Sequence, residues 1–238
     1  MKKRTFALLV SAVVLAGSAC FADSWTFNGG ASNGIDYGSA THTFASDGNS
    51  LVTLTATAHD CTASPVTGAN PCGLNNPSLP VNLFQKWGGS SGSDETGLGL
   101  ISPSGSTDPV LNNEIGIDEY VQFDFGSSFK GGSITVSLGS VQTGEGYRLA
   151  ISSTDGVFGT VPVNGAGFGN TTGIVTVTLN PGARYLDVAG NADSTHANYN
   201  VLVKSLTISS VPEPSSIALL GTGLLGSIGA IRRLMQKK

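Results

Sequence analysis

The sequence has few charged, aromatic, histidine and cysteine residues, and these shortages exclude several classes of protein. Charged residues make up 12% of the chain, too few for a helical bundle, which needs Lys and Glu on its solvent-facing surfaces. Three histidines (His42, His59 and His196) provide few bases for a catalytic site, and no Gly-x-Ser-x-Gly nucleophile elbow is present. We therefore predict a protein that is not an enzyme.

Glycine is abundant instead, with 33 residues among 238, and hydrophobic residues make up 39% of the chain. The apolar residues alternate with polar ones in short runs, which Gly-, Ser- and Asn-rich turn sequences separate. In one run, Val121, Phe123 and Phe125 share a face, and Gln122 and Asp124 are expected on the opposite, solvent-facing side. About nine to eleven such runs predict an all-β protein, a single jelly-roll-like β-sandwich.

The N-terminal residues are organised as a secretory signal peptide. A basic segment, residues 2–4, precedes an apolar stretch, residues 6–16, that is too short to span a membrane. Small residues follow, so cleavage is expected after Ala22 or, alternatively, after Ala19. We predict that residues 1–22 form a signal helix that directs the chain to the Sec export machinery.

Cleavage after Ala22 removes Cys20 and leaves two cysteines, Cys61 and Cys72. An oxidising compartment favours a disulfide between them, which closes a loop rich in Pro, Gly, Ser and Thr. The alternative is a metal site that adds His59 and Asp60, although the spacing matches no zinc pattern.

The charges are distributed unevenly along the chain. Residues 23–210 carry five basic and fifteen acidic side chains, a net charge of −10, and the other seven basic residues lie at the two ends. A domain this acidic repels phosphate groups, so we predict no nucleic-acid partner. Residues 23–210 are thus expected to form one Gly-rich, acidic β-sandwich domain.

Part of this acidity is concentrated in two Gly-rich segments close in sequence. Calcium takes oxygen ligands from carboxylates and carbonyls in such loops. The candidate ligands are Asp94, Glu95, Glu114, Asp118 and Glu119. The alternative is a set of separately solvated carboxylates, because the spacing matches no calcium-loop pattern. We predict no required cofactor, with Ca²⁺ as the one candidate.

The chain changes character after Ser210. Val211, Pro212, Glu213 and Pro214 form a rigid element, since each proline fixes its own φ angle. An uncharged stretch follows, residues 215–231, whose helix would be about 25 Å long, enough to cross a bilayer core. The chain then closes on four basic residues, Arg232, Arg233, Lys237 and Lys238. The positive-inside rule makes this end cytoplasmic, so residues 215–231 are predicted to be a C-terminal transmembrane helix.

This tail, residues 211–238, resembles the PEP-CTERM sorting signal, also called the "ice-binding protein C-terminal" domain. The resemblance implies that an exosortase, a membrane-embedded cysteine peptidase or transpeptidase, recognises the tail and processes it near the Pro212-Glu213-Pro214 element. It also implies a Gram-negative bacterium that makes exopolysaccharide. The protein would pass through an inner-membrane intermediate to the cell surface or the extracellular matrix.

A second resemblance lies within the predicted β domain. The segments LFQKWGGSSGSDETGLGLI and NEIGIDEYVQFDFG are similar to a region of several exported PEP-CTERM proteins. The residues that carry this resemblance are Asp94, Glu95, Gly97, Leu98, Gly99, Leu100, Glu114 and Ile115. It implies a shared sandwich domain and brings no established activity.

Together these features predict an exported, non-catalytic protein of the cell surface or of the extracellular polysaccharide matrix. The alternative is a surface module that binds glycans or Ca²⁺, and a secreted hydrolase is the third candidate. A glycan-binding module would offer aromatic platforms to sugars. The candidate platforms are Trp87, Tyr120, Tyr147, Tyr185 and Tyr199. Trp25 and the phenylalanines are expected to fill the core instead.

Overall fold

A computed structural model describes eleven stretches of the chain, and every structural statement below concerns them. They are residues 22–28, 34–49, 52–60, 81–89, 93–101, 113–117, 119–127, 129, 132–180, 183–191 and 200–210. Residues 22–209 form one compact unit. Residues 1–21 of the predicted signal segment, the Cys61–Cys72 loop and the sorting tail, residues 211–238, lie outside these stretches, whereas Ala22 is the first residue of β1. No helix long and apolar enough to cross a membrane occurs among the described residues.

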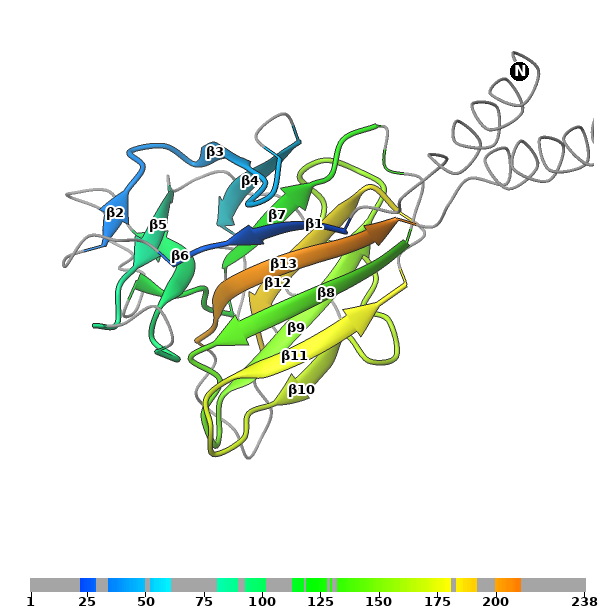
Figure 1. The fold of residues 1–238 in the computed structure, drawn as a ribbon. Coiled ribbons are helices and arrows are strands. Elements are labelled where there is room, and N and C mark those ends of the chain that lie inside the picture. The colour runs from blue at the N-terminus through cyan, green and yellow to red at the C-terminus, as the bar shows by residue number, and fades with distance from the viewer. Residues whose placement is uncertain are drawn as a thin grey trace, which may run out of the picture. The chain divides into compact units, whose positions relative to one another are not determined.

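The domain consists of two antiparallel sheets, as predicted for an all-β chain (Figure 1). The first sheet contains β1 (Ala22–Thr26), β2 (Ile35–Asp36), β5 (Asn82–Lys86), β6 (Gly97–Ile101), β8 (Gly132–Gly139), β11 (Val175–Leu179) and β13 (Leu202–Ser210). Its strand order is β11-β8-β13-β6-β5-β2, and β1 also pairs with β13.

The second sheet contains β3 (Thr41–Ala45), β4 (Thr53–Asp60), β7 (Glu119–Asp124), β9 (Gly146–Ser152), β10 (Ala166–Phe168) and β12 (Tyr185–Gly190). Its strand order is β10-β9-β12-β7-β4-β3. In Figure 1, β12 and β9 lie behind the layer formed by β13, β8 and β11. The jelly-roll-like topology stays a prediction.

The core lies between the two sheets and follows the period of two in the sequence. Ile134, Val136 and Leu138 alternate along β8 and are fully buried, as are Leu54 on β4 and Phe123 on β7. Period-two patterning places every second residue of a strand on the same face, so one face of each strand enters the core. The expectation that Trp25 belongs to the core is confirmed, since its side chain is 2% exposed.

The sequence prediction was wrong about the outer face of β7. Gln122, expected in solvent, is 2% exposed, because the segment 153–165 covers this face of the second sheet. Phe158 from that segment packs on Tyr120, Ala150 and Ala189 in a second, smaller apolar cluster. The central strands of this sheet are therefore buried on both faces, and simple alternation between apolar and polar residues does not describe them.

Candidate functional site

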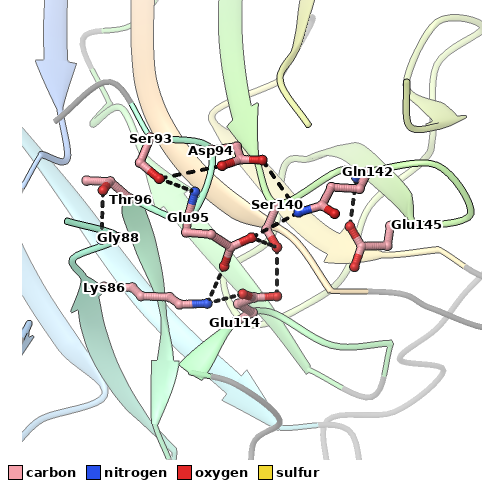
Figure 2. A network of polar contacts seen from close by, with 10 residues as sticks. All are labelled: Lys86, Gly88, Ser93, Asp94, Glu95, Thr96, Glu114, Ser140, Gln142 and Glu145. Atoms are coloured by element: carbon pink, nitrogen blue, oxygen red, sulfur yellow. Dashed lines mark hydrogen bonds and ion pairs between the residues drawn. The ribbon is translucent and has the colours of Figure 1, made fainter. Parts of the chain in front are cut away.

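A cluster of one lysine and several carboxylates forms at one end of the first sheet (Figure 2). Lys86 is the last residue of β5, and Asp94 and Glu95 lie in the turn that leads into β6. Glu114 directly precedes Ile115, which forms an isolated bridge with Val201. Ser140 and Gln142 follow β8. We refer to Lys86, Asp94, Glu95, Glu114, Ser140 and Gln142 as the lysine–carboxylate cluster.

Two glycines, Gly99 in the Gly-Leu-Gly-Leu sequence and Gly139 at the end of β8, allow these segments to come together. A Cβ atom on Gly99 would overlap the backbone oxygen of Asn113, and one on Gly139 would overlap that of Asp94. Only glycine therefore lets the segments carrying Glu114 and Glu95 approach these strands so closely. The backbone amide of Ser140 also donates a hydrogen bond, 2.8 Å long, to the backbone carbonyl oxygen of Asp94, which stabilises this close approach.

The ammonium group of Lys86 joins the two glutamates. Its Nζ lies 2.6 Å from Glu95 Oε2 and is also in direct contact with Glu114 Oε1. The hydroxyl of Ser140 lies 3.0 Å from Glu114 Oε2 and 3.3 Å from Glu95 Oε1, so it can donate to either. Gln142 Nε2 donates to Glu95 Oε1 over 3.2 Å, which leaves both glutamates with several partners (Figure 2).

Glu114 and Glu95 have different pKa values because they differ in burial and in hydrogen bonding. Glu114 is 2% exposed, and burial raises its pKa to about 7 against the opposing effect of Lys86. Burial also acts to raise the pKa of Glu95, but hydrogen bonds from Lys86 and its other neighbours outweigh it and lower the pKa below its usual value. The two carboxyl groups are coupled through their shared partner Lys86, and Glu114, with its pKa of about 7, takes up a proton at a higher pH than Glu95 does.

The structure brings together three of the five residues suggested for calcium. Glu95 and Glu114 both bind Lys86, and Asp94 lies near Gln142. Glu119 instead accepts a hydrogen bond from the Gly116 amide, 3.1 Å long, and Asp118 lies outside the described residues. Within the described stretches, no three His, Cys, Asp or Glu side chains gather as metal ligands. The positive charge between the two glutamates is that of Lys86, and the ammonium of Lys204, which donates to the Ser93 backbone oxygen, acts on Asp94.

Sequence reasoning missed Lys86, Ser140 and Gln142 as members of this site. One available signal was the position of Lys86, one of only five basic residues in the acidic domain, at the end of an apolar run. No signal pointed to Ser140 or Gln142, because the chain is rich in polar turn residues. Only the pairing of distant strands places them beside the glutamates.

Most of the described aromatic residues suggested as sugar platforms are in the interior, which corrects that expectation. Tyr120 is fully buried, and Tyr147 and Tyr185 are 8% and 6% exposed. Trp87 is half-buried, and Tyr199 lies outside the described residues. A platform needs an open ring face, so Tyr120, Tyr147 and Tyr185 do not form one.

A second buried polar network lies under the segment 153–165. Asp187 is fully buried and accepts hydrogen bonds from Gln122 Nε2 and from the Gly159 amide, both 2.8 Å long. Burial raises the pKa of Asp187 to about 7, against the opposing effect of these two bonds. Nearby, His59 stacks on Tyr120 with ring centroids 4.5 Å apart. The hydrogen bonds of Gln122 and Asp187 hold the covering segment against the sheet, and the Asp187 side chain is not exposed to solvent.

Comparisons with known proteins identify the tail but not the β domain. Residues 210–233 match the sequence profile of the PEP-CTERM protein-sorting motif. No curated protein matches the chain. Among solved structures, the chain is similar to the K1 cleaved adhesin domain of Lys-gingipain from Porphyromonas gingivalis W83, with 16% identity and a TM-score of 0.37. That match covers 80% of this chain and 99% of the adhesin domain.

Two further structures resemble the chain to a similar degree. The K2 cleaved adhesin domain of Lys-gingipain has 13% identity and a TM-score of 0.34, over 79% of this chain and 99% of that domain. Chitosan-binding module 1 of a chitosanase/glucanase from Paenibacillus sp. IK-5 has 15% identity and a TM-score of 0.30, over 54% and 93%. At these scores the likenesses carry no argument about the function of this chain.

Proposed function

From the PEP-CTERM sorting motif that this exported chain carries, we propose a non-catalytic protein of the cell surface or the extracellular polysaccharide matrix. An exosortase recognises and processes its tail. The signal peptide, residues 1–22, directs Sec export, and residues 215–231 hold the intermediate in the inner membrane of a Gram-negative bacterium. Residues 23–210 are the part that is displayed, as a jelly-roll-like sandwich.

The position of the sorting motif is the observation that carries this proposal. The match begins at residue 210, which is also the last residue of β13. The folded domain and the sorting motif are therefore consecutive in the sequence, and the Val211–Pro214 element comes directly after the residues of β13. Such an order suits a domain that is released or transferred as a unit once the tail is processed.

The chemistry of the domain supports a role without catalysis. The two glutamates with the most divergent acidities are both bound to Lys86, and Glu114 is buried. A general acid and base must instead reach a substrate in a cleft. The excess of acidic over basic side chains keeps a displayed domain soluble and repels anionic surfaces. A Cys61–Cys72 disulfide would suit the oxidising compartment.

Intact-mass measurement of the natively expressed protein, combined with cell fractionation, tests the proposal. We expect a mass that ends near Pro212–Pro214 in the surface or medium fraction. In a strain without exosortase, or in a variant with Pro212→Ala, Glu213→Ala and Pro214→Ala together, the full tail should remain in the inner membrane. Substituting Ser215→Ala and Ser216→Ala is the matched control and should leave processing intact.

Intact mass and fractionation can also contradict the proposal. If the wild-type protein retains Arg232 to Lys238 and stays in the inner membrane of a strain that contains an exosortase, the protein is an anchored periplasmic domain. The matrix proposal is then wrong.

A further inference from the structure

The lysine–carboxylate cluster contains the groups needed to form an amide bond between two side chains. Lys86 Nζ is in direct contact with Glu114 Oε1, so the nitrogen lies next to the carboxyl carbon, Cδ, of Glu114. A second carboxylate, Glu95, lies 2.6 Å from the same nitrogen. An amine, a carboxyl group and a proton acceptor are thus in mutual contact within one site.

The surroundings of these groups favour condensation over simple ion pairing. The Glu114 side chain is 3% exposed and the Lys86 side chain 20% exposed, so little water reaches the reacting atoms. Burial raises the pKa of Glu114 to about 7, and a neutral carboxylic acid is a far better electrophile than a carboxylate. Glu95, whose pKa is lowered, remains ionised and can accept a proton.

We propose that Lys86 and Glu114 condense after folding into an intramolecular amide cross-link, with Glu95 as the proton acceptor. The ammonium of Lys86 first gives one proton to Glu95, and the resulting amine attacks Cδ of Glu114. The N–Cδ bond forms and the Cδ–hydroxyl bond breaks. The hydroxyl leaves as water with the second amine proton, the amide nitrogen keeps the third, and Glu95 ends as a neutral acid.

Enforced proximity lowers the barrier to this condensation, which is very slow between separate groups in dilute solution. Well-oriented intramolecular groups react with effective molarities on the order of 10⁵–10⁸ M. The local backbone holds the geometry: Asn113, next to Glu114, and Ser140 have φ angles of 59° and 52°. They are the only non-glycine residues of the described stretches in the left-handed region, and such strain persists only where the surroundings enforce it. Condensation also removes the charges of the partly buried pair Lys86 and Glu95, whose desolvation is costly.

The acidity of Lys86 determines when the bond forms. Burial acts to lower the pKa of Lys86, but the hydrogen bonds and charges of Glu114 and Glu95 outweigh it and raise the pKa. Proton transfer from Lys86 to Glu95 is therefore uphill and makes the reaction slow compared with folding. No oxidant or cofactor is required, because the only product released is water.

The bond would close a loop between residues 86 and 114, which are 28 positions apart in the sequence. The cross-link would join the end of β5 to the segment before β7, whose Ile115 forms a bridge with Val201 next to β13 of the first sheet. It would limit unfolding of a displayed domain outside the cell, in the way that a disulfide does, and would survive reducing conditions.

Mass spectrometry of the full chain, reduced to remove any disulfide, tests the proposal. We expect folded wild-type protein to be about 18 Da lighter than its sequence mass. Chain recovered from inclusion bodies in denaturant, which has not yet folded, should start at the full sequence mass and lose about 18 Da over time after refolding. Peptide mapping should find one branched peptide that contains both Lys86 and Glu114. Trypsin should no longer cleave after Lys86.

Three variants separate the proposed bond from other dehydrations. Lys86→Arg preserves the positive charge at the cluster but cannot form the amide, so it should show the full sequence mass. Glu95→Gln keeps both reacting groups and removes the proton acceptor, so it should also show the full mass or a strongly delayed loss. Ser140→Ala should still lose about 18 Da, because an ester of Ser140 is not the product.

Two results would overturn the proposal. One is wild-type protein that is folded, by circular dichroism, yet keeps its full sequence mass after prolonged storage. The other is a mass deficit that persists in Lys86→Arg, which would place the dehydration elsewhere in the chain.

Discussion

The buried carboxyl of Asp187 predicts an unusual pH dependence of stability. The side chain is fully buried beneath the segment 153–165, and burial raises its pKa from 3.8 to about 7. The folded state therefore holds a proton on Asp187 between about pH 4 and pH 7 that the unfolded state has lost. Because the folded pKa is the higher one, this stabilisation is complete below the unfolded pKa and is lost as the pH rises through about 7.

The size of this change in the free energy of unfolding follows from the pH range over which only the folded state holds the proton. Each pH unit corresponds to about 1.4 kcal/mol, so between pH 5 and pH 8 the Asp187 carboxyl should cost the folded protein on the order of 3 kcal/mol. Asp187→Asn removes the titrating group and keeps the shape of the side chain. The variant should therefore gain about 3 kcal/mol relative to wild type when the pH is raised from 5 to 8, whatever its stability at pH 5.

Urea unfolding of both proteins at pH 5 and pH 8 measures this difference, with the fluorescence of the buried Trp25 as the probe. Glu114 titrates in the same direction, but it is present in both proteins and cancels in the comparison. Val163→Ala, at a fully exposed position of the covering segment, removes no titrating group; it is the control and should leave the pH dependence unchanged. If Asp187→Asn differs from wild type by the same free energy at both pH values, the reasoning from burial is wrong.

Two further predictions concern packing and backbone geometry. Phe123→Ala, at a fully buried position between the sheets, should lower the free energy of unfolding by about 3–5 kcal/mol, whereas Val163→Ala, at a fully exposed one, should change it by less than about 0.5 kcal/mol. A similar cost for both in urea unfolding would contradict the assigned core. Gly34→Ala should cost at least about 1 kcal/mol more than Gly38→Ala, although both have left-handed φ angles of 76° and 61°. At Gly34 a Cβ meets the Phe84 ring and lies 2.7 Å from the Gln85 oxygen, whereas at Gly38 it meets nothing within 4 Å, so equal melting temperatures would refute the crowding at Gly34.

The burial of the outer face of the second sheet is a feature that the alternation of apolar and polar residues does not predict. Period two in the run around Phe123 correctly placed its apolar residues in the core, because alternation is a local property of a strand. The same pattern placed Gln122 in solvent, which is wrong. The covering segment 153–165 comes from more than 30 residues further along the chain, as in the hydrogen bond between Gly156 and Gln122. No local periodicity encodes such a contact.

In the candidate site, too, some residues could be predicted from the sequence and others could not. The Gly-Leu-Gly-Leu segment with Asp94, Glu95 and Glu114 could be singled out from the sequence, and the structure explains its glycines by close backbone approach. Carboxylates close together in the sequence predict a cation between them, and Ca²⁺ is the ion that carboxylates in Gly-rich loops favour. The cation found among them is Lys86, and its position depends on the pairing of β5 with β6.

The sequence by itself determined the sorting motif at residues 210–233, the all-β class and the residues that alternate into the core. These properties depend on contiguous residues, whose order is enough to specify a linear motif or a strand face. The tertiary structure alone decided which strands are neighbours, which outer face is covered and which charges meet. Those features arise from antiparallel pairing across distant segments, and that pairing places Lys86 against Glu114 and Gln122 against Asp187.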